Sequence, residues 1–209
     1  AEDFPQFKTL FISRLKDMLS DDALGAFILV LANSRQNSYL KAELETDLEA
    51  VFSSLKDRAA NGKLEAPKDD LDVFDQLVSA DLCNIPEWQS RLVGDWEIAC
   101  NTIRRLRPAR SSSQTFDSIK QPFDDNKFHF NKPFLKPEIL WQGEYEAHQL
   151  RVLYNKFPFS EYHLLIAVDA QKNFPQVMTQ ELHQINCLLV NDVAETLPGF
   201  GIGMAEHHK

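Results

Sequence analysis

The sequence lacks an apolar run long enough to cross a membrane. Its longest such run covers residues 23–32 and includes Gly25, whereas a transmembrane helix needs ~20 apolar residues. The chain also does not open with the charged, apolar and small-residue regions of a secretory signal. We therefore expect a cytoplasmic protein that makes no membrane contact.

Cysteine and positive charge are also scarce. The three cysteines, Cys83, Cys100 and Cys187, show no C-x-x-C spacing. This predicts buried thiols in a reducing compartment, not a disulfide framework or a zinc site. Lysine and arginine number 22 against 31 aspartates and glutamates, which gives a net charge of -9. That balance disfavours a broad nucleic-acid-binding surface, although a small anionic ligand needs only a local cationic cluster.

The first hundred residues contain apolar side chains at helical spacing. Phe4, Phe7, Phe11 and Leu15 fall mostly three or four residues apart, which gathers them on one helical face. Ser20-Asp21-Asp22 is a typical helix start before a strongly apolar segment. The pattern predicts helices over residues 4–19, from about residue 23, over 38–60 and over 70–79, and one that begins near Pro86 and carries Trp88 and Leu92.

The pattern changes to that of strands near Gly94. Trp96, Ile98 and Cys100 alternate with mostly polar residues, which predicts a strand. A short strand over residues 138–142 and a turn at Gly143-Glu144 are expected next. We therefore predict an α+β protein with a helical region over residues 1–94 and an antiparallel sheet region over residues 95–209.

Two apolar runs, 150–154 and 164–168, flank the segment Asn-Lys-Phe-Pro-Phe-Ser-Glu-Tyr. The proline and the polar ends of that segment predict a turn, so the two runs form a β-hairpin. A helix over residues 179–195 should cross the sheet. Gly199, Gly201 and Gly203 then alternate, which predicts a third strand whose bare face admits a ligand or another part of the chain.

A short basic stretch stands out in this acidic chain. Arg104, Arg105, Arg107 and Arg110 precede the sequence SSSQ. Guanidinium groups match the oxygens of a phosphate. A solvated strand end and loop explains the same residues, and we favour that interpretation on sequence alone.

Three segments together resemble a known superfamily. QPFDDNKFHFNK, LYNKFPFSEYHLLIAVDAQKNFPQ and LPGFGIGM are similar to the catalytic region of the histidine-triad-like nucleotidyltransferases. The GDP-hexose phosphorylases are the nearest branch, followed by the diadenosine tetraphosphate phosphorylases. The resemblance covers roughly residues 121–204 and leaves the helical region outside.

The resemblance implies a nucleotide site at one end of an antiparallel sheet. In that superfamily a histidine attacks the α-phosphorus, and phosphate then takes over the nucleotidyl group from the histidine. The substrate would be a nucleoside diphosphate sugar or a dinucleoside polyphosphate, with inorganic phosphate as the second reactant and neither cofactor nor metal. The implied nucleotide-binding residues are Asn155 for the ribose, Lys156 for phosphate, Phe157 or Phe159 for the base, His163 on the phosphate side, and the glycines Gly201 and Gly203.

Each of these residues also has an ordinary structural explanation. Asn155 is at home in a turn, Lys156 is typical of a solvated loop, and His163 borders an apolar run. The superfamily's His-x-His-x-Gln motif is not found: His207 and His208 are adjacent, so a strand would point them to opposite faces.

The catalytic residue is therefore unknown from the sequence, and two explanations stay open. Either the remainder of a working enzyme lies beyond these residues, or the chain is a nucleotide-binding module without turnover. An interaction protein is a further alternative, because the acidic helical region could dock onto a partner or a second copy in a homodimer.

Overall fold

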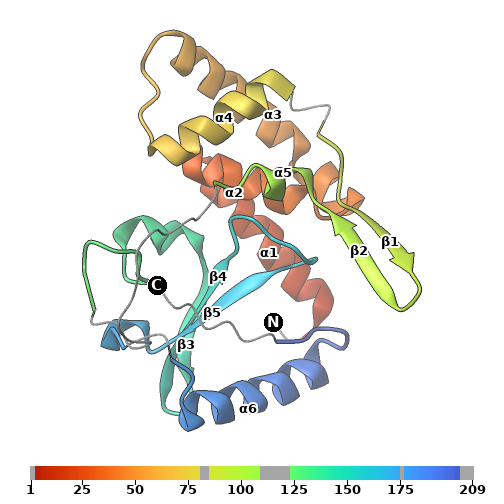
Figure 1. Ribbon diagram of the computed structural model, residues 1–209, viewed down its shortest axis with the longest axis vertical. Coiled ribbons are helices and arrows are strands. Elements are labelled where there is room, and N and C mark those ends of the chain that lie inside the picture. The colour runs from red at the N-terminus through yellow and green to blue at the C-terminus, as the bar shows by residue number, and fades with distance from the viewer. Residues whose placement is uncertain (1–2, 81–84, 109–122, 175–176, 203–209) are drawn as a thin grey trace. The chain divides into compact units, whose positions relative to one another are not determined.

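The computed structural model describes residues 3–80, 85–108, 123–174 and 177–202 (Figure 1). It confirms the α+β class: helices come first, followed by two small antiparallel sheets and a C-terminal helix. The chain divides into two compact units. Unit 1 contains Ala1–Leu10, Ser111–Leu153 and Ile166–Lys209, and unit 2 contains Phe11–Arg110 and Tyr154–Leu165. The predicted domain boundary between residues 94 and 95 concerns independent folding and stays a prediction.

The first four helices form where the apolar spacing predicts them. Asn37 caps the longest one, because its side chain accepts a hydrogen bond from the Leu40 N–H at 2.9 Å. The segment after Asp22 is buried over most of its surface, as its continuous apolar sequence predicts. The helices are α1 (Phe4–Leu19), α2 (Leu24–Ser34), α3 (Ser38–Ala60), α4 (Lys68–Ala80) and the single turn α5 (Thr102–Arg105).

Three phenylalanines join α2, α3 and α4 in the core of unit 2. Phe27 stacks on Phe52 with ring centroids 5.7 Å apart, and Phe74 meets both rings edge-on at 6.4 and 5.8 Å. All three side chains are buried. Aromatic pairs in these geometries add to the stabilisation that comes from area burial alone.

The helix predicted to begin near Pro86 is wrong. The structure places β1 (Gln89–Val93) there instead, paired antiparallel with β2 (Trp96–Cys100) around Gly94, whose φ is +60°. The strand predicted at β2 is confirmed. Pairing with β2 outweighs the helical spacing of Trp88 and Leu92, because strand propensity depends mainly on cross-strand neighbours. This ribbon exposes apolar side chains, Trp96 among them at 79%.

Unit 1 contains most of a three-stranded sheet in the order β3–β4–β5. Its strands are β3 (Ile139–Tyr145), β4 (His148–Tyr154) and β5 (Leu164–Val168). β3 and β4 pair antiparallel, and hydrogen bonds from Asn155 N to His163 O and from Asp169 N to Gln149 O show that β4 and β5 do as well. The predicted hairpin is thereby confirmed.

The turn predicted at Gly143-Glu144 is wrong. The first turn of this sheet lies at Glu146-Ala147. Both turn residues have positive φ, of 45° and 64°, which suits a two-residue hairpin because that turn follows the twist of the strands. Gly143 instead lies within β3, where a Cβ atom would come within 2.5 Å of the Trp141 ring. Here glycine makes room for an aromatic ring.

Helix α6 (Gln180–Thr196) covers one face of the sheet, as predicted. Ile185 and Leu189 pack against Leu150, while Leu153, which points to the opposite face, packs with Leu135 and Ala167. Leu135 belongs to the 3₁₀-helix η2 (Pro133–Glu138). The two faces of the sheet therefore have separate apolar clusters.

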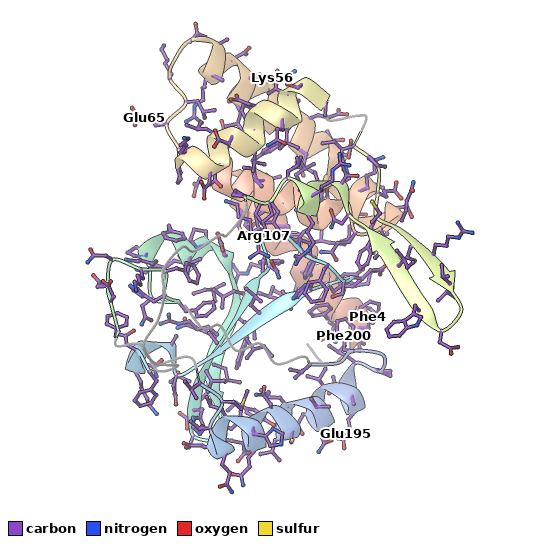
Figure 2. All side chains as sticks on the ribbon, in the orientation of Figure 1. Phe4, Lys56, Glu65, Arg107, Glu195 and Phe200 are labelled. Carbon is purple, nitrogen blue, oxygen red and sulfur yellow. The ribbon has the colours of Figure 1, made fainter. Side chains whose placement is uncertain are left out.

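The predicted glycine-rich strand is wrong over the residues that the structure describes. Leu197–Gly199 form a turn, with Gly199 at a φ of +96°, and residues 200–202 have no regular structure. Phe200 instead joins an aromatic cluster with Phe4 and Phe7 (Figure 2), with ring centroids 5.8 and 5.5 Å away. An apolar contact thus holds this segment without strand pairing.

Two cysteines are exposed, contrary to the expectation of buried thiols. Cys100 lies on β2 in unit 2, and Cys187 lies on α6 in unit 1. The third, Cys83, falls outside the described residues. Within the described ranges, none of the helices combines the length and the apolarity needed to cross a bilayer.

Phe74→Ala should remove the ring that meets both Phe27 and Phe52 and leave a cavity between α2, α3 and α4. We expect the free energy of unfolding to fall by ~3–5 kcal/mol, measured by urea denaturation. Val78→Ala on the same helix is the control, because that side chain is 43% exposed and should change stability by less than ~1 kcal/mol. Equal effects of the two substitutions would contradict the described core.

Candidate functional site

The loop between β4 and β5 holds the residues that the sequence singled out, and it belongs to unit 2. Asn155, Lys156, Phe157 and His163 all lie in it. Tyr154 anchors its start: the ring is buried and its hydroxyl donates to the Phe11 carbonyl at 2.6 Å. The structure therefore brings four of the six predicted nucleotide-binding residues into one loop.

The side chains of Asn155 and His163 face each other across this loop. Asn155 Nδ2 lies 3.2 Å from His163 Nε2, and Asn155 Oδ1 accepts the Phe157 N–H at 3.0 Å. The Phe159 N–H points to His163 Nδ1 at 3.3 Å. Two donors therefore approach the ring. A neutral imidazole can accept one of them at its unprotonated nitrogen, whereas an imidazolium can accept neither.

The pKa of His163 lies below its ordinary value. Burial lowers its pKa, and the nearby positive charge of Arg104 lowers it further. Both effects disfavour the charged ring, because desolvation penalises a charge and a second cation repels it. His163 is accordingly a neutral hydrogen-bonding group near pH 7.

Lys156 forms an ion pair with Asp70 of α4. The Lys156 Nζ and Asp70 Oδ1 atoms are 2.5 Å apart, and both side chains are largely buried. Gly25 of α2 lies against this pair, since a Cβ atom there would come within 3.1 Å of Asp70 Oδ2. The ion pair fixes the loop to α4, and contact between Lys156 and phosphate stays a prediction.

Arg104 supports the loop from α5. Its guanidinium donates to the Phe157 carbonyl and lies 5.0 Å from the centroid of the Phe159 ring. Asn101, which caps α5 through the Arg104 N–H at 3.0 Å, also donates to the Pro158 carbonyl at 3.0 Å. The Phe157 side chain is buried, whereas Phe159 is 57% exposed, so Phe159 is the aromatic ring available for stacking.

Two arginines beside this loop have no carboxylate partner among the described residues. No described Asp or Glu lies within ion-pair distance of Arg104 or Arg107. Burial lowers the pKa of Arg104, and repulsion from Arg107 lowers it further. An anion placed between these groups and His163 would relieve that repulsion.

The two glycines predicted to bind nucleotide are not part of this loop. Gly201 belongs to unit 1 and is exposed, and a Cβ atom there would meet nothing within 4 Å. The structure therefore shows no close approach that requires glycine at this position. Gly203, His207 and His208 lie outside the described residues.

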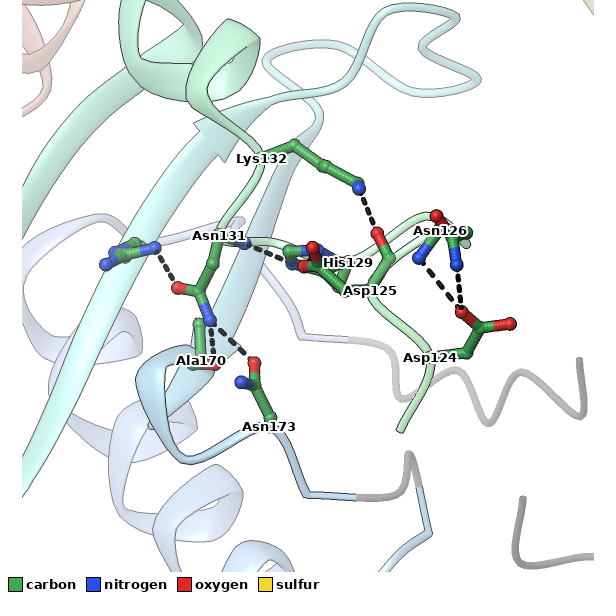
Figure 3. Close-up of polar contacts among 9 residues, drawn as sticks. Asp124, Asp125, Asn126, His129, Asn131, Lys132, Ala170 and Asn173 are labelled. Atoms are coloured by element: carbon green, nitrogen blue, oxygen red, sulfur yellow. Dashed lines mark hydrogen bonds and ion pairs between the residues drawn. The ribbon is translucent and has the colours of Figure 1, made fainter. Parts of the chain in front are cut away.

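A polar cluster in unit 1 is built from the segment FDDNKFHFNK (Figure 3). Asn131 Nδ2 donates to the Ala170 carbonyl at 2.6 Å and to Asn173 Oδ1 at 2.7 Å, while Arg151 donates to Asn131 Oδ1 at 2.8 Å. The Asn131 N–H points to His129 Nδ1 at 3.2 Å. The cluster ties this irregular segment to β4 and to the turn after β5, which is a structural role.

Two histidines of unit 1 have carboxylate partners. His129 Nε2 lies 2.9 Å from Asp125 Oδ1, and the His148 ring lies between Asp169 at 2.7 Å and Glu181 at 3.3 Å. Burial raises the pKa of Asp169. Hydrogen bonds from Lys172, the Gln149 N–H and His148 outweigh that effect and hold the pKa well below its usual range. No described group of three or more His, Cys, Asp or Glu residues has a geometry that could hold a metal ion.

Comparison with known protein families gives a match. Residues 89–203, more than half of the 209 in the chain, match the GDPGP1-like N-terminal domain. The chain belongs to this family. The match supports the relationship to the GDP-hexose phosphorylases. It begins further upstream than the three segments that carry the resemblance in the sequence. Comparison with curated proteins found no match, and comparison with solved structures found none either.

Sequence reasoning missed the residues that hold the loop from the helical region. Asn33 and Gln36 follow the apolar run of α2, and both are buried, at 0% and 2% exposure. A signal was present, since polar residues directly after a buried helix need partners. Asp70 carried no signal, because nothing local distinguishes it from the neighbouring acidic residues of α4.

The lowered pKa of His163 makes stability depend on pH. Near pH 6.5 the unfolded chain binds a proton at this site more readily than the folded chain does, so neutral His163 favours the fold above that pH, and this contribution is lost as pH falls through the folded pKa. We expect His163→Gln to lose less unfolding free energy than the wild type between pH 7.5 and 5, measured by urea denaturation. The exposed His183→Gln variant should follow the wild type. Identical pH profiles for all three would contradict the assignment.

The Lys156–Asp70 pair should contribute more to the free energy of unfolding than a surface ion pair does. In a double-mutant cycle with Lys156→Met and Asp70→Asn, we expect a coupling energy of at least ~1 kcal/mol, because removing one partner leaves a largely buried charge. The pair of Lys16 and Glu43, separated by 3.7 Å with both side chains more than 40% exposed, is the control. Its coupling should lie between ~0 and 1 kcal/mol. Equal couplings would show that Lys156 is not held as described.

Proposed function

We propose that this chain provides the nucleotide-binding site of a phosphorylase that acts on a nucleoside diphosphate sugar. The observation that carries the proposal is the loop at Asn155–His163, in a chain of the GDPGP1-like family, next to arginines that have no ion pair with any carboxylate the structure describes. A dinucleoside polyphosphate is the alternative substrate, since it presents the same nucleotide and phosphate groups. Inorganic phosphate is the second reactant.

The described residues suit the parts of such a nucleotide. Asn155 uses one N–H and one lone pair within the described contacts, which leaves one of each for the vicinal ribose hydroxyls. Arg104 and Arg107 supply charge for the phosphates. Phe159 offers an exposed ring for the base. Neutral His163 provides a hydrogen-bonding group without adding a further charge.

The reaction transfers a nucleotidyl group twice. A histidine nitrogen attacks the α-phosphorus, the bond to the bridging oxygen breaks, and hexose 1-phosphate leaves. Inorganic phosphate then attacks the same phosphorus, which yields a nucleoside diphosphate and restores the histidine. No residue within the described ranges is assigned as that nucleophile. The described residues bind and orient the nucleotide, and no cofactor is expected.

Binding of GDP by isothermal titration calorimetry tests the site. We expect Arg104→Gln to weaken GDP binding at least tenfold, since a hydrogen bond to a charged group contributes ~1.5–3 kcal/mol. Asn155→Ala should weaken it by a similar factor. Arg105→Gln is the matched control, because the exposed Arg105 is the next residue on the same turn and should leave the Kd unchanged.

Release of GDP from GDP-glucose and phosphate tests turnover. Binding together with release supports the phosphorylase. Binding without release instead supports the alternative, a nucleotide-binding module without turnover. If the wild-type chain neither binds GDP nor releases it, the proposed function is wrong.

A further inference from the structure

The end of α2 buries an unusual run of polar side chains. Asn33, Ser34, Arg35 and Gln36 are all at most 2% exposed. Burying a polar group without a partner costs ~1–3 kcal/mol, so each such group needs a hydrogen bond. For Asn33 and Gln36, the partners include the backbone of the loop that carries Asn155 and His163.

Asn33 and Gln36 together connect the two ends of that loop. Asn33 Nδ2 donates to the Asn155 carbonyl at 3.0 Å and to the Leu29 carbonyl at 2.9 Å. Asn33 Oδ1 accepts from Gln36 Nε2 at 2.7 Å. Gln36 Oε1 in turn accepts the Tyr162 N–H. One hydrogen-bonded pair therefore holds both the residue that starts the loop and the residue just before His163.

The conformation of Tyr162 explains why such support is needed. Its φ is +50°, in the left-handed region, which costs a residue other than glycine roughly 1–2 kcal/mol. Packing of its buried ring on Phe11, with centroids 5.2 Å apart, and the bond to Gln36 offset this cost. His163 is the next residue, so the backbone at Tyr162 sets where the imidazole lies.

We propose that Asn33 and Gln36 are positioning residues for nucleotide binding, which act by fixing Asn155 and His163 relative to each other. The inference rests on the proposed function of this loop. Both residues lie before residue 89, outside the segment that matches the family. The helical region would then determine nucleotide affinity, in addition to supporting the fold.

A merely structural role would give a different result from a positioning role. Ser34→Ala is the matched control, because Ser34 is equally buried and its hydroxyl donates to the Leu31 carbonyl at 2.8 Å, within its own helix. Gln36→Met removes both hydrogen bonds at similar volume. Gln36→Glu is the conservative variant, because burial favours the protonated carboxyl, which keeps an acceptor for the Tyr162 N–H and an O–H donor for Asn33 Oδ1.

Two measurements on the full chain test the proposal: the Kd for GDP and the NMR signals of the His163 ring, assigned by their absence in His163→Gln. We expect Gln36→Met to raise the Kd about tenfold and to shift the His163 signals, Gln36→Glu to have a smaller effect, and Ser34→Ala to match the wild type in both. Should Gln36→Met be unfolded, Gln36→Glu against Ser34→Ala gives the same comparison.

The outcomes separate this proposal from the function on which it rests. If the wild type binds GDP and the Gln36 variants match Ser34→Ala in Kd and in the His163 signals, the positioning role is overturned. If the wild type does not bind GDP, the proposed function is overturned, and the His163 signals then show only whether Gln36 controls the geometry of the loop.

Discussion

The buried polar groups of an irregular loop need hydrogen-bonding partners, and the candidate site depends on this constraint. A loop between two strands has no neighbouring strand to accept and donate its backbone hydrogen bonds. Here the Asn155 and Pro158 carbonyls receive amide N–H groups from Asn33 and Asn101, and the Phe157 carbonyl receives a guanidinium. The loop is therefore shaped by side chains from other segments, and that shape brings Asn155 to His163.

The charges around the loop differ from the net charge of the chain. The chain carries a net charge of -9, yet the arginines beside the loop have no carboxylate neighbour among the described residues. Asp70 pairs with Lys156 and neutralises its charge, which leaves the arginines as the unpaired cations beside the loop in the part of the chain that the structure describes. An acidic protein can therefore offer a local site for an anion. Charges within a few ångströms of the anion determine its binding, because solvent and salt screen the more distant charges that make up the net charge.

Much of this could be predicted from the sequence, and the failures have physical causes. The spacing of Leu44, Leu48 and Leu55 predicts α3, and alternation predicts β2, because each signal is local. The ribbon partner β1 was missed because pairing with Trp96–Cys100 overrides local spacing. The turn at Glu146-Ala147 was misplaced because Gly143 makes room for Trp141. Within the site, Asn155 and His163 could be predicted because one loop supplies both. Asn33, Gln36 and Asp70 are distant from that loop in the sequence, and no local pattern indicates that they contact it.

The exposed cysteines have a practical use. Among the residues that the structure describes, Cys100 lies in one compact unit and Cys187 in the other. With Cys83 changed to serine, nitroxide spin labels would attach to these two sulphur atoms alone. The distribution of distances between the labels, with and without GDP, would then measure how the two units are placed relative to each other.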